Sequence, residues 1–235
     1  MFKIVLDAGH GYYTAGKRCL KKIDPKETRE WSLNSRICEK IQKLLTAYDG
    51  YDVLRVDDTT GKKDIALSTR TNNANKYKAD IYLSIHHNAG IKGGSGGGVV
   101  AYIYKKASAK TVEWQKALYN AIIKNTGLKG NRATPLAPGD YWVTRKTTMP
   151  AVLLELGFMD STVDTPIILT EDYADKVAQA IVSVIVAKGG LTKKVVEQPT
   201  ENNKIYRVQV FAGSKAGAEN LVKKLKADGY DAIIV

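Results

Sequence analysis

The stretch that decides the fold is Asp80-Ile81-Tyr82-Leu83-Ser84-Ile85-His86-His87-Asn88, a short apolar run that ends in two adjacent histidines and an asparagine. A run of this length, bounded by polar residues, predicts a buried β-strand. The chain has only three histidines, and two of them stand at the end of this strand. An imidazole there could be a metal ligand or a general base, or it could lie on the surface of a loop. This stretch alone does not decide between these roles.

The third histidine follows another apolar run. Residues 2–6 predict a second buried strand, which leads into Asp7-Ala8-Gly9-His10-Gly11. The glycines of this segment permit a sharp turn that presents a side chain at the edge of a sheet. His10 is therefore expected to occupy the same position after its strand as His86 does after its own.

A carboxylate interrupts a third apolar run, Pro150-Ala151-Val152-Leu153-Leu154-Glu155-Leu156-Gly157-Phe158. Burying a charged group without a partner is costly. We therefore expect Glu155 to pair with a cation or a metal ion, or to be held protonated.

Helical and strand patterns alternate between these runs, which predicts an α/β fold with a twisted, mainly parallel central sheet flanked by helices. The site of such a fold gathers at the carboxyl ends of the strands, where His10, His86 and Glu155 are expected. Apolar periodicity predicts helices over residues 31–48, 69–77, 111–125 and 170–189, further strands over 51–56, 99–104 and 141–143, and a surface loop over 128–139.

Composition narrows the class of partner. The 235 residues carry a formal net charge of +12, which favours nucleic acid, an anionic membrane face or acidic wall polymers. No dense arginine block interleaved with aromatic residues occurs, so we expect no nucleic acid partner, and no apolar run is long enough for a transmembrane segment. Cys19 and Cys38 lack metal-binding spacing; they could form one disulfide, but two free thiols are expected. The oligomeric state is not predicted.

The chain is expected to divide into residues 1–188, a polar linker over 189–203 and a small β-α-β piece over 204–235. In that piece the predicted helix over 216–227 is expected to bury one apolar face. About thirty residues are too few to bury a core alone. We therefore expect the piece to be truncated or to pair with a second copy.

Two histidines and a carboxylate from separate elements can hold zinc tetrahedrally and leave one position for water. The sequence offers His10, His86 and either Glu30 or Glu27 as ligands, with Glu155 as the acid/base that moves a proton from water to the leaving amine. Neither G-x-S-x-G nor an activated cysteine near histidine is present to support a nucleophilic triad.

The sequence resembles the zinc-dependent N-acetylmuramoyl-L-alanine amidases of bacterial and phage cell-wall lysis. The segments that carry the resemblance are 4–11, 29–34, 70–75, 84–89 and 149–158, which occur in the family's order. The resemblance implies Zn²⁺ on His10, Glu30 and His86, Glu155 as the catalytic glutamate, and bacterial peptidoglycan as substrate. It selects Glu30 because the family pattern places an asparagine, here Asn34, four residues after the glutamate.

Two further expectations concern the surroundings of these residues. The family pattern Ser-x-His-x-Asn selects His86 as ligand, so His87, which points to the opposite face of the strand, is expected to be a packed neighbour. The family often has a second glycine where this chain has Tyr12, which is expected to reshape the rim of the groove and leave the ligands intact.

The tail over 206–232 resembles a SPOR (sporulation-related) peptidoglycan-binding repeat, of which about half is present. The short apolar start lacks a cleavage site, so we expect no signal peptide and access to the wall after lysis or phage-assisted release, as in an endolysin or a mother-cell autolysin. The alternatives are an inactive wall-binding module with an amidase-like fold and a zinc peptidase that cuts the stem peptide.

Overall fold

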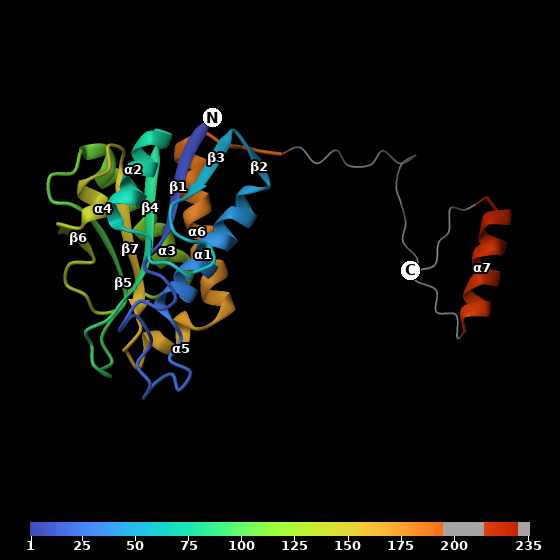
Figure 1. Cartoon of the computed structure of the whole chain (residues 1–235), viewed down its shortest axis with the longest axis horizontal. Helices are drawn as coiled ribbons and strands as arrows, with labels where there is room; N and C mark the ends of the chain where they lie inside the picture. Colours follow the sequence, from blue (N-terminus) through green and yellow to red (C-terminus); the bar gives the residue numbers. More distant parts are fainter. Residues whose placement is uncertain (195–213, 230–235) are drawn as a thin grey trace. The chain divides into compact units, whose positions relative to one another are not determined.

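The computed structural model describes residues 1–194 and 214–229, and residues 1–194 belong to one compact unit (Figure 1). Its strands are β1 (Phe2–Ala8), β2 (Tyr48–Asp49), β3 (Tyr51–Arg55), β4 (Ile81–Asn88), β5 (Val99–Tyr104), β6 (Leu136–Gly139), β7 (Ala151–Phe158) and β8 (Thr192–Lys193). Its helices are α1 (Glu30–Leu45), α2 (Leu67–Tyr77), α3 (Ala109–Thr126), α4 (Trp142–Arg145), α5 (Asp164–Ile168) and α6 (Glu171–Gly189). The helix α7 (Lys215–Ala227) lies in the second part of the chain.

A six-stranded sheet in the order β3-β1-β4-β7-β5-β6 forms the centre of the unit. Every pairing in it is parallel except that of β5 with β7, so the predicted α/β fold with a mainly parallel sheet is confirmed. The carboxyl ends of β1, β4 and β7 therefore lie at one edge, next to one another. A second, two-stranded sheet pairs β2 with β8 in antiparallel fashion.

The continuous apolar runs of β1, β4 and β7 arise because both faces of the sheet are covered. The larger core lies between the sheet and the helices α1, α3 and α6, and includes Leu6, Leu83 and Leu154. The smaller core lies on the opposite face, toward α2 and α4, and includes Tyr82 and Leu153 (Figure 1).

Helix ends follow the sequence signals. Ser108 and Thr170 begin α3 and α6, and the side chain of each accepts a hydrogen bond from a backbone N–H of the first turn. Gly127 and Gly190 end these helices in the left-handed conformation that glycine adopts without strain. The predicted helices over 31–48 and 69–77 correspond to α1 and α2, although Tyr48 lies in β2 rather than in the helix.

Two predicted segments were wrong. Residues 141–143, predicted as a strand, begin α4, because the carbonyl oxygen of Tyr141 accepts the backbone N–H of Arg145 and Val143 packs into the smaller core. The predicted loop over 128–139 contains β6, an edge strand in which Pro138 is tolerated because no second partner needs its missing N–H.

In α7 the predicted apolar face is present, but none of its residues is buried, contrary to the expectation for Ala218, Leu221, Val222 and Leu225. The two strands of the predicted β-α-β piece lie outside the described residues. None of the described helices is long and apolar enough to cross a bilayer.

Candidate active site

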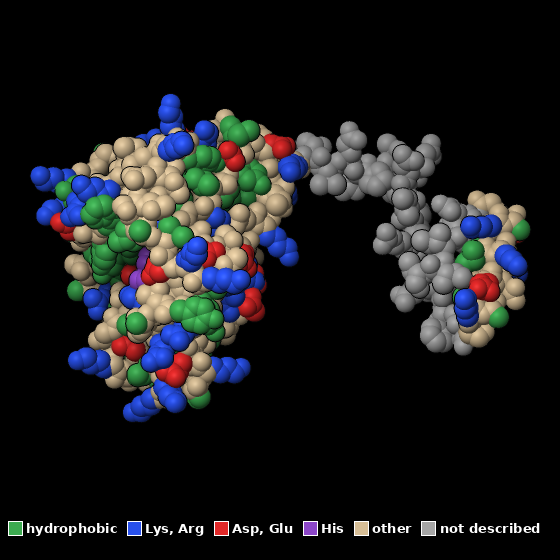
Figure 2. All heavy atoms as spheres, viewed as in Figure 1, with side chains coloured by type: hydrophobic (Ala, Val, Ile, Leu, Met, Phe, Trp, Pro, Cys, Tyr) green, Lys and Arg blue, Asp and Glu red, His purple; other side chains and the backbone are tan. Residues whose placement is uncertain are grey.

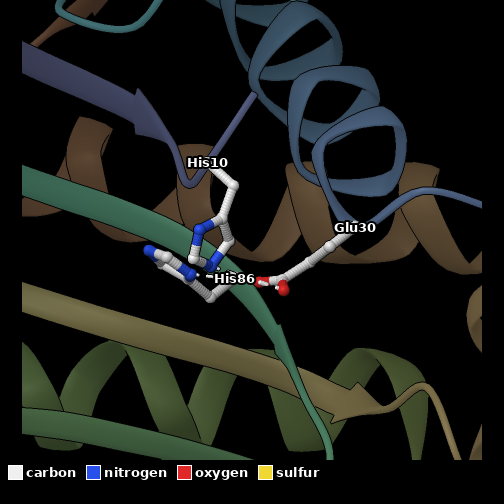
Figure 3. Close-up of side chains that lie close together, drawn as sticks. All are labelled: His10, Glu30 and His86. Carbon is white, nitrogen blue, oxygen red and sulfur yellow. Dashed lines mark hydrogen bonds and ion pairs between the residues drawn. The ribbon is translucent and has the colours of Figure 1, made fainter. Parts of the chain in front are cut away.

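Three side chains from separate elements converge at the carboxyl edge of the sheet (Figure 3). His10 follows β1, Glu30 is the first residue of α1, and His86 lies in β4. The Nε2 atom of His10 is 3.4 Å from Glu30 Oε2, and the Nδ1 atom of His86 is 3.1 Å from Glu30 Oε1. One potential ligand atom from each residue lies within 4.8 Å of the others, so this group has the spacing of a metal site.

The turn at His10 is fixed by a buried guanidinium. His10 adopts a positive φ of 67°, which is uncommon outside glycine. Arg70 of α2 donates hydrogen bonds to the carbonyl oxygens of Ala8 (2.8 Å) and His10 (3.0 Å), and it pairs with the buried carboxylate of Asp7. The neighbouring strand and helix therefore hold the backbone of this turn in a conformation that it would not favour by itself.

Gly9 makes room for the ring of His86. A Cβ atom built at position 9 would lie 2.0 Å from His86 Cε1, so any side chain there would displace the imidazole. The backbone N–H of Gly9 also donates to the carbonyl oxygen of Ile85 at 2.9 Å, which keeps the two strands in register up to the site.

Glu30 is held as a buried anion. Its side chain is only 1% exposed, and burial alone would raise its pKa. The hydrogen bond and charge of His86, with the charges of His10 and Lys17, instead lower the pKa of Glu30 to about 2. Glu27, the alternative ligand considered from the sequence, lies outside this group and pairs with Arg18 at 3.2 Å.

His87 lies on the opposite side of β4 from His86 and is buried against α1. Its Nδ1 atom is 2.8 Å from Asn34 Oδ1, and the amide nitrogen of Asn34 donates to the carbonyl oxygen of Gly9 at 3.2 Å. Burial lowers the pKa of His87 to about 3, so this imidazole is neutral at ordinary pH. The backbone N–H of His87 donates to Glu30 Oε1 at 3.2 Å, and the residue therefore supports the carboxylate through its main chain.

Glu155 lies beside this group, because it is the register partner of His86 across the β4–β7 pairing. Its Oε2 atom is buried without a hydrogen-bond partner, and burial raises the pKa of Glu155 to about 7. A carboxyl group with a pKa near neutrality can both accept and donate a proton. The sequence expectation of a paired or protonated Glu155 agrees with this environment.

The donor set suits a zinc ion. Two imidazole nitrogens and one carboxylate oxygen form a ligand set that is found in catalytic zinc sites. Glu30 Oε2 is buried and has no hydrogen-bond partner, as expected for an oxygen that faces a cation. With Glu155 alongside, the arrangement can support hydrolysis of an amide bond.

Comparison with known proteins agrees with this chemistry. Residues 4–187 match the family model described as N-acetylmuramoyl-L-alanine amidase. The chain belongs to this amidase family. The match covers most of the chain and ends before the tail, so the family resemblance inferred from the sequence is confirmed for the first part of the chain.

Individual proteins resemble the chain in sequence and in structure. It is 30% identical over 236 residues to the N-acetylmuramoyl-L-alanine amidase CwlM of Bacillus licheniformis, covering 100% of this chain and 85% of the relative. The endolysin of Bacillus phage SPP1 is 32% identical over 197 residues, covering 83% and 69%. The solved catalytic domain of CwlV, an amidase from Bacillus (Paenibacillus) polymyxa var. colistinus, matches with a TM-score of 0.70 and 26% identity, covering 80% of this chain and 98% of that domain.

Sequence reasoning on this amidase did not find the residues that position the ligands. The role of Gly9 was hidden, because its contact with His86 joins residues that are far apart in the chain. Lys17, whose Nζ atom lies 3.8 Å from Glu30 Oε2, belongs to no sequence motif or periodic segment that would mark it as part of the site. Arg70 stood in one of the segments that carried the resemblance, but its hydrogen bonds to the His10 turn became visible only in the structure.

Proposed function

We propose that this amidase hydrolyses the amide bond between N-acetylmuramic acid and L-alanine in bacterial peptidoglycan with a zinc ion held by His10, Glu30 and His86. Glu155 is the general acid/base. The observation that carries the proposal is the convergence of this His-Glu-His group, with Glu155 in register beside it, in a chain of the amidase family.

When bound, zinc would supply a Lewis acid that polarises the amide carbonyl and lowers the pKa of a water molecule. Glu155 accepts a proton from the attacking water and returns it to the leaving nitrogen of L-alanine. Its pKa of about 7, raised by burial, suits both transfers. The low pKa of Glu30, which the neighbouring His86, His10 and Lys17 produce against the effect of burial, favours the ionised carboxylate that a metal ligand requires.

Digestion of purified cell walls tests the reaction. We expect new L-alanine amino groups without new reducing sugars, and we expect their release to stop with a chelator and resume when zinc is restored. New reducing ends would identify a glycosidase instead. Mass spectrometry of the fragments distinguishes cleavage at the N-acetylmuramic acid linkage from cleavage within the stem peptide, the product of a zinc peptidase. An inactive wall-binding module would release neither product.

We also propose that residues 204–235 form about half of a SPOR-like repeat that adds affinity for peptidoglycan. The helix α7 agrees with the predicted position of the helix in this repeat, and its partly exposed apolar face suits a piece that needs further contacts. We also propose that the enzyme reaches the wall after lysis or phage-assisted release, which is supported by its similarity to a phage endolysin.

A further inference from the structure

The exposed aromatic side chains of the described residues are not scattered. Four of the large hydrophobic residues that remain exposed are aromatic: Tyr12 (40%), Tyr13 (73%), Tyr141 (38%) and Trp142 (38%). Two of them follow His10 in the loop after β1, and the other two follow β6. In the sheet β4 and β7 separate β1 from β5 and β6. Because β6 is antiparallel to β7, its carboxyl end lies away from His86, but Tyr141 packs against Tyr102, whose register partner Leu153 precedes Glu155 by two residues in β7. Tyr12 and Tyr13 thus lie on the β1 side of His86 and Glu155, and Tyr141 lies on the β5 side. Hydrophobic side chains lie on both sides of the visible histidine surface in Figure 2.

Within the first pair, Tyr12 is held by contacts with Gly61, Trp31 and Tyr13. The backbone N–H of Tyr12 donates to the carbonyl oxygen of Gly61 at 2.8 Å. The ring of Tyr12 contacts that of Tyr13 edge to face, with centroids 5.0 Å apart, and that of Trp31 at 6.2 Å. Trp31 in turn packs against Gly61, where a Cβ atom would lie 2.8 Å from the indole ring. Tyr12 is therefore positioned by its neighbours, and Tyr13, which is 73% exposed, packs against its ring.

The same loop is tied at a second point. Thr14 accepts the backbone N–H of Gly11 at 2.9 Å and donates its own hydroxyl to Asp64 at 2.7 Å. Asp64 also pairs with Arg70 at 3.0 Å, the residue that fixes the turn at His10. The position of the tyrosine pair is consequently coupled to that of the candidate ligand His10.

The second pair lies close to two cations, whereas the ring of Tyr12 lies near one, the guanidinium carbon of Arg29 at 5.9 Å from the ring centroid. The ring of Trp142 lies 5.7 Å from the guanidinium carbon of Arg145 and 5.5 Å from Nζ of Lys146. Tyr141 packs against Tyr102 with ring centroids 5.0 Å apart, and burial, followed by the nearby Tyr102 and Glu155, raises the pKa of its phenol to about 12. This side of the site thus combines aromatic surface with positive charge, which suits carboxylate groups.

The reaction assigns a direction to the substrate. Glu155 returns the proton to the leaving nitrogen, so that nitrogen and the peptide attached to it must lie on the β7 side of the site. The acyl half of the amide, which carries the sugar, then extends toward His10 and Tyr12. Tyrosine faces are neutral and apolar with a polar edge, and they can cover the ring of a sugar while the hydroxyl groups remain solvated.

We propose that Tyr12 and Tyr13 form a subsite for the glycan strand of peptidoglycan, on the side of the site opposite to that of the stem peptide. This assignment rests on the proposed amidase function. The two rings bind the saccharide beyond the scissile amide and so make the enzyme prefer longer glycan strands.

Binding to glycan strands that lack peptide tests the subsite without any hydrolysis. The probes are strands of alternating N-acetylglucosamine and N-acetylmuramic acid in two lengths, together with free stem peptide, titrated against the zinc-loaded full chain by calorimetry. We expect the double variant Tyr12→Ala, Tyr13→Ala to bind the longer strand about tenfold more weakly than the unmodified enzyme. Its affinity for the stem peptide is expected to be unchanged, and the variant Tyr12→Phe, Tyr13→Phe should restore glycan binding.

Tyr104→Ala serves as the matched control, because this tyrosine ends β5, which runs antiparallel to β7, and therefore lies at the end of the sheet away from His86. It should bind both probes normally. Equal glycan affinity in the double alanine variant and the unmodified enzyme, with amino groups still released from walls, would overturn the subsite alone. Lost peptide affinity with intact glycan affinity would overturn the assigned direction. If the unmodified enzyme releases no amino groups, the proposed function fails, whatever the glycan titration shows.

Discussion

Glu155 is the residue on which the proposed proton transfers depend. Replacing it by glutamine keeps the shape of the side chain but removes the group that titrates. We expect Glu155→Gln to retain zinc and to lose about 100- to 10,000-fold in turnover, measured as amino groups released from cell walls. Glu27→Gln, in a residue that pairs with Arg18 away from the site, should remain close to normal. A fully active Glu155→Gln enzyme would exclude the assigned role.

The adjacent histidines 86 and 87 provide a second test at the level of single residues. His86 belongs to the metal-binding group, whereas Nδ1 of His87 faces Asn34. We expect His86→Ala to purify without zinc and His87→Ala to retain it, with an affinity reduced by no more than about 10- to 100-fold. Metal analysis of the purified variants checks both. Equal loss of zinc from the two variants would show that the opposite side-chain directions of His86 and His87 along β4 do not separate their roles.

Gly9 allows a test of the space reserved for His86. In Gly9→Ala the new methyl group would overlap the imidazole, so we expect zinc affinity to fall about 10- to 100-fold while the fold persists. Competition with a chelating dye measures the affinity, and circular dichroism monitors the fold. Gly16→Ala is the control in the same loop, since its Cβ meets nothing within 4 Å and only its positive φ is strained. Normal zinc binding by Gly9→Ala would mean that the ring adjusts freely.

The residues that carry the chemistry could be found from the sequence because strand ends are visible as breaks in apolar runs. His10, His86 and Glu155 each stand at or near such a break. The residues that orient them could not, because the contacts of Gly9 with His86 and of Asn34 with His87 depend on how strands and helix pack.

At the level of elements, the ion pair of Asp7 with Arg70 joins β1 to α2 inside the protein. The hydroxyl groups of Tyr82 and Ser84 also donate to this carboxylate, at 2.8 and 2.9 Å. Removing one partner of a buried pair leaves the other charge uncompensated. We expect Asp7→Asn to lower the free energy of unfolding at neutral pH by about 3 to 5 kcal/mol, measured by urea denaturation.

The same pair predicts a pH dependence. Burial would raise the pKa of Asp7, but the charges of Arg70 and His86 and the hydrogen bonds from Arg70 and Tyr82 lower it below the ordinary 3.8. The folded state therefore binds this proton more weakly than the unfolded chain, so the stabilisation is complete above the ordinary pKa and is lost as the pH falls through the folded value. The stability difference between the unmodified protein and Asp7→Asn should narrow below about pH 4. A difference that stays constant down to acid unfolding would contradict the assignment.

Elements with strong apolar periods were predictable, and those stabilised by a few distant contacts were not. α1, α3 and α6 show the helical period over many residues and begin or end near the expected positions. β6 has only four residues and contains Pro138, so its strand character comes from pairing with β5 and from Gln115, which donates to the carbonyl oxygen of Ala137. α4 is one turn long, which is too short for a period to appear.

For the whole molecule, alternation of helices and strands predicted the α/β class but not the direction of β5. A helix joins most successive strands of the sheet, whereas β4 and β5 are separated by the glycine-rich segment 93–98. In the sheet β5 lies on the far side of β7 from β4, and it runs antiparallel to β7. This arrangement depends on packing across the whole sheet. Asp164 helps to fix the segment by accepting the backbone N–H of Gly98 at 2.7 Å and that of Phe158 at 2.9 Å.

The extent of the catalytic unit gives a prediction at this scale. The predicted boundary lies at residue 188, but β8 pairs with β2, and Lys194 donates its backbone N–H to the carbonyl oxygen of Ala47 at 2.9 Å. Leu191, 7% exposed, belongs to the larger core. Residues 1–194 form their own compact unit. We therefore expect a chain that ends at Lys194 to unfold at the same temperature as this unit does in the full chain, and to cleave soluble muropeptides as fast as the full chain does.

A chain ending at Gly189 is the matched comparison, because it lacks both Leu191 and β8 while it keeps the candidate ligands and Glu155. Loss of one buried leucine costs about 2 kcal/mol, which lowers the melting temperature of a unit of this size by about 5 °C. Calorimetry of the two shortened chains separates the outcomes, and sedimentation with whole walls shows what the tail contributes to binding. If the chain ending at Lys194 cleaves soluble muropeptides more slowly than the full chain, the tail takes part in catalysis and the two units do not act independently.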